Sequence, residues 1–290
     1  PYYFTDGYAL YHKESKEQEL VVVRKNDTRR EYEVLAGTKV IGKGSFGGHA
    51  HIEKVIVPPS VKVIEEDAFE SCQALQEAVF SEGLEEIQTD AFSYCVNLTE
   101  ITLPASLTVL GEKALTNTFG WSDKVNGITR IWVAAGNPVF YADENALYEK
   151  CKDKGEKLVK YFGNEREYQI PFGVSEIGWS ACKRAGFRKL VIASSVHAVE
   201  DKAFTECKNL EWIRLEEDQA MLYVPQTPVY RKDEVTKLLS WDEAAPVYDY
   251  AGYDKLFETY FYLTDRVKMA CCRLKYPVCL TENMQDAYRS

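Results

Sequence analysis

Several features that would point to common functions are missing from this sequence of 290 residues. No apolar run approaches the roughly 20 residues that a membrane-spanning helix needs. Acidic residues outnumber basic ones, with 45 aspartates and glutamates against 35 lysines and arginines, and the net charge is −10. Nucleic-acid binding in general needs a basic footprint, which this chain lacks. We therefore expect no membrane insertion and no nucleic-acid partner.

Patterns for catalysis and metal binding are equally scarce. The chain has four histidines, no Ser/His/Asp or Cys/His spacing stands out, and no acidic run matches a calcium loop. The eight cysteines are even in number, but this does not imply a disulfide framework in a domain of this size. We expect no catalytic residue, no metal site and no cofactor. No signal peptide is visible, and because the first residue is a proline this says little about the compartment.

One glycine-rich run is similar to the ATP-binding loop of protein kinases. The run is VIGKGSFGGHA, residues 40–50, with G-x-G-x-x-G at Gly42, Gly44 and Gly47. A kinase also needs V-A-I-K, H-R-D and D-F-G motifs downstream, and the chain has none of them. Without its strand and helix context the glycine pattern is weak evidence for a nucleotide site.

A repeat of 23 residues explains the run instead. Residues 61–83 read VKVIEEDAFESCQALQEAVFSEG, and residues 84–106 read LEEIQTDAFSYCVNLTEITLPAS. The two copies share an isoleucine, an Ala-Phe pair, a cysteine and a leucine at the same spacing. Further copies begin at Thr38, Leu107, Val174 and Val196, of which those at Leu107 and Val174 are degenerate.

The slots of the repeat give each unusual residue a structural role. Phe46 fills the phenylalanine slot of the first copy and His49 its cysteine slot, so Gly42 and Gly44 lie in the turn before the buried pair. In the copy from Val174, Cys182 takes the phenylalanine slot. We expect the cysteines of the repeat slot to be buried free thiols, because parallel side chains have the wrong relative direction for a disulfide. His49-Ala-His51 could place two metal ligands on one strand, but the core slot favours a buried histidine at position 49.

A period of this length predicts a solenoid, in which stacked units bury a continuous core. The pattern V-x-x-I-x-x-x-A-F-x-x-C-x-x-L-x-x-I-x-L-P resembles the BspA-type leucine-rich repeat over residues 30–218. The stretch NPVFYADENALYEK, residues 137–150, resembles the β-hairpin module that such proteins insert between repeats, and the amino terminus repeats it. The resemblance implies a parallel β face and a role in adhesion or ligand binding, often at a cell surface.

After Asp218 the period ends and helical spacing begins, for example in YDKLFETYF, residues 253–261. We therefore predict a mainly β repeat solenoid of leucine-rich-repeat type, with hairpin insertions and a C-terminal α-helical cap. The predicted divisions are an N-terminal hairpin cap (1–37), repeats (38–133), an inserted hairpin module (134–173), repeats (174–218) and the helical cap (219–290).

The outward residues of the predicted strands are the candidate contact surface. Tryptophan and arginine most often carry binding energy at interfaces, and both occur here on a predicted solvent face. The alternative is that the tail or the hairpins cover the tryptophans. The predicted partner-binding residues are Trp132, Trp212, Arg130, Arg214, Lys189, Lys54, Glu77 and Glu100.

The main hypothesis is thus a non-catalytic module that binds a protein or glycan, and the resemblance favours the cell surface or secretion. One rival is an intracellular scaffold that acts through the helical segment, because free cysteines suit a reducing compartment. Another is an enzyme with a site in the insertion Phe119–Gly127 or in the hairpins, which a cluster of perturbed carboxylates would favour.

Overall fold

The structure, a computed structural model, describes residues 2–14, 17–115, 127–152, 155–200, 202–204, 207, 209–210 and 212–215. For residues 212–215 it describes the backbone alone. These residues form β-strands and turns, and no helix that could span a membrane is found among them. The chain divides into two compact units, Pro1–Leu147 and Tyr148–Ser290, and each is described by itself. The predicted helices of residues 219–290, and residues 119–126 of the insertion, lie outside the described residues.

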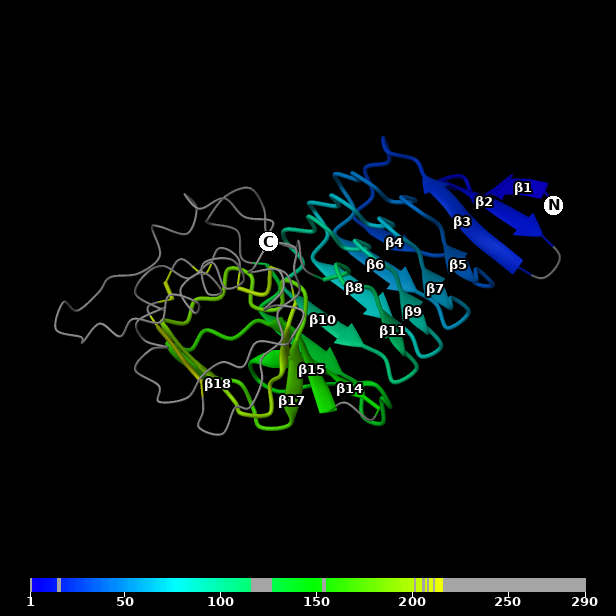
Figure 1. Cartoon of the computed structure of the whole chain (residues 1–290). Coiled ribbons are helices and arrows are strands. Elements are labelled where there is room, and N and C mark those ends of the chain that lie inside the picture. Colours follow the sequence, from blue (N-terminus) through cyan, green and yellow to red (C-terminus); the bar gives the residue numbers. More distant parts are fainter. Residues whose placement is uncertain are drawn as a thin grey trace, which may run out of the picture. The chain divides into compact units, whose positions relative to one another are not determined.

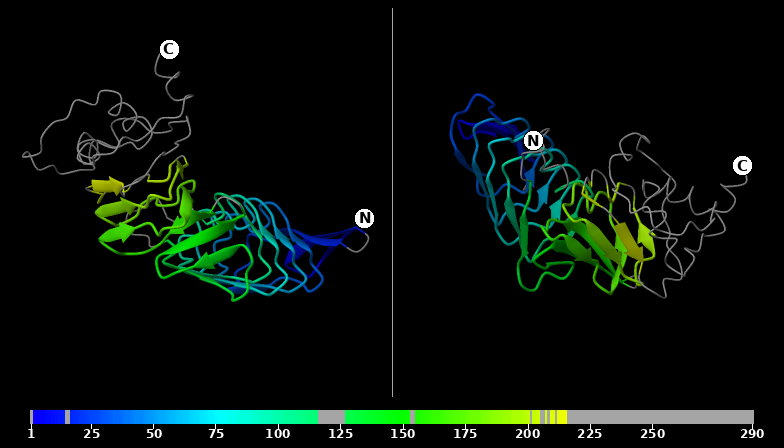
Figure 2. Two further views of the ribbon diagram at one scale, coloured as in Figure 1. Left: turned by 60° about the horizontal axis from the view of Figure 1, so that its bottom comes forward. Right: turned by 90° about the vertical axis from the view of Figure 1, so that its left-hand side faces the viewer.

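Each repeat turn of the first unit contributes one long and one short strand (Figure 1). The long strands form a three-stranded and a two-stranded parallel sheet, made of β4 (Glu31–Glu33), β6 (Lys54–Val57) and β8 (Glu77–Phe80), and of β10 (Glu100–Leu103) and β12 (Arg130–Val133). The short strands are β5 (Val40–Ile41), β7 (Val63–Ile64), β9 (Glu86–Ile87) and β11 (Val109–Leu110). Figure 2 shows these turns from two further directions as a regular coil, coloured from blue through cyan to green.

The period of the sequence sets the register of these sheets. Val55 pairs with Ala78, and Val63 pairs with Glu86, so partners in consecutive repeats are 23 residues apart. The strands run parallel because each one returns to the same side after a full turn of the chain. The predicted mainly β solenoid with a parallel β face is therefore confirmed.

The Ala-Phe pair of the repeat forms the centre of the core. Phe69 is 1% exposed and lies between Phe46 and Phe92, with ring centroids 4.5 and 4.9 Å away and both pairs stacked. The alanine before the phenylalanine is fully buried at Ala68 and Ala91, where a larger side chain would separate the turns. The stack therefore joins three consecutive turns through one column of rings.

Two left-handed positions in the turn explain the glycine-rich run. The residue before the small one of the Ala-Phe pair has φ of 59° at Asp67 and Asp90, and 62° at Gly44. The residue before the cysteine slot has φ of 60° at Ser71, and 70° at Gly48. Glycine adopts such angles without the steric cost of a Cβ atom. The first repeat thus carries glycine where the fold requires a left-handed residue, which needs no nucleotide.

The β-hairpins predicted at two places are present. The first consists of β1 (Tyr2–Thr5), β2 (Ala9–Glu14) and β3 (Glu17–Val23), which pair antiparallel and join the short strands in the sheet order β1-β2-β3-β5-β7-β9-β11. The second comprises β13 (Phe140–Ala142), β14 (Ala146–Cys151) and β15 (Gly155–Tyr161).

The second unit repeats the solenoid geometry. The parallel sheet β16-β18-β20 contains its long strands, β16 (Glu167–Gln169), β18 (Lys189–Ile192) and β20 (Trp212–Leu215). The short strands β17 (Val174–Ile177) and β19 (Ala198–Val199) continue the sheet order β13-β14-β15-β17-β19. Cys182 takes the phenylalanine slot as predicted, since its amide donates to the carbonyl of Ala203 as that of Phe69 does to Ala91.

Candidate binding surface

The outward side chains of the long strands in the first unit form one continuous surface, which we call the β face. Alternate residues of each strand point into the core, as shown by Val55, Ala78, Ile101 and Ile131, all 8% exposed or less. The β face consists of the residues between them: Glu31, Glu33, Lys54, Ile56, Glu77, Val79, Glu100, Thr102, Arg130 and Trp132.

Trp132 is the most exposed large apolar side chain of the β face, with 52% of its surface accessible. It lies on β12, in register with Thr102 of β10, while Arg130 is in register with Glu100. The Arg130 guanidinium carbon is 5.1 Å from the centroid of the Trp132 ring. This distance is within the range of cation–π attraction, which orients both side chains on the surface.

Carboxylates outnumber basic groups on the β face, and one ion pair joins two of its strands. The ammonium nitrogen of Lys54 is 2.9 Å from a carboxylate oxygen of Glu77, and this hydrogen bond holds the pKa of Lys54 above its usual value. β4 lies within residues 1–37, the predicted hairpin cap, and adds Glu31 and Glu33 at the edge of the surface. The repeat period predicts this strand, because Glu31 precedes Lys54 by 23 residues.

The remaining candidate residues lie in the second unit. Lys189 forms an ion pair with Glu167 of β16, a strand within residues 134–173, the predicted hairpin module. Trp212 and Arg214 lie on β20, in backbone register with Lys189 and Val191. The structure thus brings Glu100, Arg130 and Trp132 together on the adjacent strands β10 and β12. It places Lys189 and Trp212 in register on the adjacent strands β18 and β20, and of β20 only the backbone is described.

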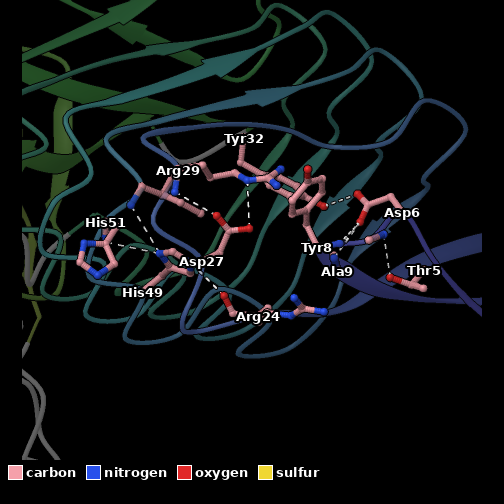
Figure 3. A network of polar contacts seen from close by, with 12 residues as sticks. Thr5, Asp6, Tyr8, Ala9, Arg24, Asp27, Arg29, Tyr32, His49 and His51 are labelled. Atoms are coloured by element: carbon pink, nitrogen blue, oxygen red, sulfur yellow. Dashed lines mark hydrogen bonds and ion pairs between the residues drawn. The ribbon is translucent and has the colours of Figure 1, made fainter.

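Polar groups around the first hairpin form a separate network (Figure 3). The Arg29 guanidinium lies 3.1 Å from the centroid of the Tyr8 ring, and its Nε is 3.1 Å from an Asp27 carboxylate oxygen. Burial opposes ionisation of Asp27, but the hydrogen bond from the Arg29 backbone amide and the nearby Arg29 guanidinium lower its pKa. His49 is fully buried with Nε2 3.2 Å from the carbonyl of Arg24, and burial lowers its pKa. The network holds the hairpin turn against the first repeat, and the burial of His49 favours its neutral form.

The thiols of the repeat slot are free and buried, as expected. Those of Cys72, Cys95 and Cys207 donate to backbone carbonyls one turn away at 3.2, 3.1 and 3.0 Å. Burial raises the pKa of Cys72 to about 12 and that of Cys95 well above its usual range. A protonated thiol is a poor nucleophile and a poor metal ligand. Within the described ranges, no three potential ligand side chains are grouped so as to hold a metal ion.

Among the described residues of the second unit, one carboxylate with a perturbed pKa, Glu200, lies in a cluster of charged groups. The ammonium nitrogen of Lys157, on β15, is 2.9 Å from a carboxylate oxygen of Glu176, on β17, and 2.7 Å from one of Glu200, which directly follows β19. Burial raises the pKa of Glu200, and Glu176 adds to this effect while Lys157 opposes it. Glu200 also accepts a hydrogen bond from the Trp179 amide at 2.7 Å. The cluster therefore joins successive strands, and its groups are engaged with one another.

The stacked turns, the parallel long strands and the exposed β face define a leucine-rich-repeat solenoid. The family model described as BspA type leucine rich repeat region matches in six copies, over residues 30–125 and 148–222, and the chain belongs to this family. Repeat proteins of this kind are generally non-catalytic binding or adhesion modules.

Solved structures of bacterial leucine-rich repeat proteins have a similar fold. A protein from Eubacterium ventriosum has 17% identity and a TM-score of 0.50, with 73% of this chain and 71% of that chain covered. The pneumococcal vaccine antigen PcpA has 17% identity and a TM-score of 0.48, covering 75% of this chain and 71% of that one. At this identity the likeness to the Eubacterium ventriosum protein supports the fold alone. No curated protein sequence matches the chain.

Proposed function

We propose that this chain is a non-catalytic binding module that recognises a protein or glycan partner along its outward long-strand surface. Trp132 and Arg130 are the centre of the contact. The other proposed contact residues are Lys54, Glu77 and Glu100 in the first unit, and Lys189, Trp212 and Arg214 in the second.

The exposure of Trp132 is the observation on which this proposal depends. Tryptophan is highly buried on average, so a ring that is 52% exposed on a rigid strand retains much apolar area that a partner could cover. Its position on a parallel sheet fixes the backbone, and Arg130 restricts the ring from one side. Binding would therefore require little ordering of the site, which lowers the entropic cost of association.

The carboxylates around Trp132 favour particular partner chemistry. Glu100 is exposed next to Arg130, and Glu77 is exposed on the neighbouring β8. A protein surface with lysines or arginines around an apolar group would complement this arrangement. A sugar could also stack on the indole while its hydroxyls bond the carboxylates. Polyanionic partners would instead be repelled.

Affinity measurements on single variants test the proposal. Wild-type protein is first applied to a glycan array and to an array of purified extracellular-matrix proteins. Binding of each ligand found is then measured by calorimetry for Trp132→Ala and Arg130→Ala. We expect Trp132→Ala to weaken binding by roughly 2 kcal/mol, about 30-fold in Kd, as for a central aromatic contact. Trp212→Ala, measured alongside, tests the second unit separately.

Phe172→Ala is the matched control, because Phe172 is 81% exposed but lies in the turn between β16 and β17. Circular dichroism must show that all variants are folded. Equal affinity of wild type and both tryptophan variants would contradict the proposal and direct attention to residues 219–290, the segment favoured by the scaffold alternative.

A further inference from the structure

The cysteine slot of the first repeat contains a side chain that titrates near neutral pH. His49 fills this slot and is buried, like Cys72, Cys95 and Cys207 in later repeats. A thiol is uncharged in neutral and mildly acidic water, whereas an unperturbed histidine gains a proton at about pH 6.5. The first repeat turn can therefore respond to mild acid through a position at which the turns with cysteine cannot.

The imidazole of His49 takes part in closing its turn. In later repeats the leucine three residues after the cysteine closes the turn, because its amide donates to the cysteine carbonyl. These bonds are 3.1 Å long in the pairs Leu75 with Cys72, Leu98 with Cys95 and Leu210 with Cys207. Ile52 holds the leucine position in the first repeat, and its amide donates to Nδ1 of His49 at 3.4 Å, as does the amide of His51. A titratable ring thus stands where later repeats use a backbone carbonyl.

The partners of the ring require its neutral form. Its other nitrogen, Nε2, is 3.2 Å from the carbonyl of Arg24, in the turn between β3 and β4 (Figure 3). A carbonyl can only accept and a backbone amide can only donate, so Nε2 carries the proton and Nδ1 carries none. A second proton at Nδ1 would face two N–H groups and break both hydrogen bonds. It would also place a charge at a side chain without exposed surface, which is costly.

The charged groups around the ring do not remove this cost. Burial lowers the pKa of His49, and this effect exceeds the opposing effects of the Arg24 carbonyl and the Asp27 carboxylate. Asp27 is already ion-paired with Arg29, and the charges of Arg29 and of a protonated His51 act against protonation of the buried ring. Two further titratable groups lie nearby, the Lys25 ammonium and the protonated thiol of Cys72. The slot as a whole therefore favours the neutral ring.

We propose that His49 is an acid-sensitive switch of the first repeat turn. Protonation breaks the bonds that Ile52 and His51 make to the ring, and the charged ring regains water only by leaving its slot. Its bond to the Arg24 carbonyl is then lost as well, so the turn of residues 24–30 separates from residues 47–53. The turns with cysteine stay closed under the same conditions, because buried thiols gain no charge in mild acid.

The direction of the effect follows from the two states of the ring. In the closed turn the pKa of His49 is lowered, whereas in the open turn it has the ordinary value of about 6.5. The closed turn is therefore most favoured above about pH 6.5, and the open turn gains up to about tenfold in relative population for each pH unit below it. This gain ends once the pH has fallen through the lowered pKa of the closed turn.

Hydrogen exchange of the full chain at pH 7.5 and pH 5.0 tests the switch, with protection expressed relative to an unfolded peptide at the same pH. We expect the protection of residues 24–30 and 47–53 to fall by about tenfold at the lower pH. Residues 93–99, the corresponding turn around Cys95, are the internal reference and should change by less than about twofold.

Two asparagine variants assign the effect to one ring. His49→Asn keeps a side-chain acceptor for the two amides but cannot be protonated, so it should abolish the fall in protection. His51→Asn, at the exposed histidine two residues away, is the matched control and should leave the fall intact. His49→Cys restores the residue of the later repeats and should act as His49→Asn does.

A titration of the wild-type imidazoles by NMR keeps the test decisive where substitutions at this core position prevent folding. The signal assigned to His49 by its contact with Ile52 should titrate at lower pH than those of the other three histidines. A His49 ring that becomes protonated by pH 5.0 while both segments stay protected would overturn the proposal. Unchanged protection of the wild type at pH 5.0, or an equal loss in wild type and His49→Asn, would overturn it too.

Discussion

Asp67 shows at the scale of one residue what the repeat turn demands. Its φ of 59° lies in the left-handed region, and its carboxylate is close to Glu66 and Asp90. Burial raises the pKa of Asp67, and the two neighbouring carboxylates raise it further. Ionisation of Asp67 therefore costs more free energy in the folded state than in the unfolded chain. Gly44 occupies the corresponding position of the first repeat.

We predict that Asp67→Gly stabilises the protein by about 1 kcal/mol, because glycine removes the steric cost of left-handed backbone and the repulsion between carboxylates. Urea denaturation at pH 7 measures the change. Gln76→Gly is the control, since Gln76 is exposed and its φ is not positive, and it should destabilise by a similar amount, about 1 kcal/mol. If Asp67→Gly lowered stability as Gln76→Gly does, the left-handed position would not be strained.

At the scale of elements, the period allowed the strands of the repeats to be predicted, but not those that begin each stack. β6, β8 and β10 occur in repeated copies, so their alternation and their outward residues could be read directly. β4 and β16 follow the hairpins, where no complete repeat precedes them, so the repeat pattern alone does not predict that Glu31, Glu33 and Glu167 point outward. The ion pair of Lys54 with Glu77 could not be foreseen either, because register alone does not fix where long side chains point.

The Asp6 carboxylate connects the first hairpin to β4 and should make this element sensitive to acid. Its Oδ2 accepts from the hydroxyls of Tyr32 and Tyr11 at 2.9 and 3.3 Å. Burial acts to raise the pKa of Asp6, but hydrogen bonds from the backbone of Ala9 and Tyr8 and from both tyrosines outweigh it and lower the pKa below 3.8. The stabilisation is therefore present above the usual pKa of an aspartate and is lost as the pH falls through the lowered value.

We predict that Asp6→Ala destabilises the protein at pH 6 by roughly 2 kcal/mol, because backbone amides and two tyrosine hydroxyls lose an acceptor. Asp6→Asn, which keeps one acceptor oxygen, should cost less. The free energy of unfolding, measured from pH 6 to pH 2, should differ most between wild type and Asp6→Asn at the higher pH, and the difference should shrink below about pH 4. An unchanged difference over this range would assign the acid sensitivity to other groups.

At the scale of the molecule, stability is distributed along a stack in which each turn contacts mainly its neighbours. The column of Phe46, Phe69 and Phe92 carries this coupling in the first unit. We predict that Phe69→Ala destabilises the unit by about 3–5 kcal/mol, because it leaves a cavity between two stacked rings. Phe69→Leu, which refills most of that space, should cost clearly less.

The spatial pattern of the loss distinguishes a stack of turns from a single cooperative core. In a repeat array, amide protection should fall most in the short strands of the turns that Phe69 joins, β5, β7 and β9, and less in β11 and β2, which lie further along the sheet. Hydrogen exchange with peptide-level resolution measures this gradient. A uniform loss from β2 to β11 would instead mean that the first unit opens as one block, and that the hairpin and the repeats fold as a single element.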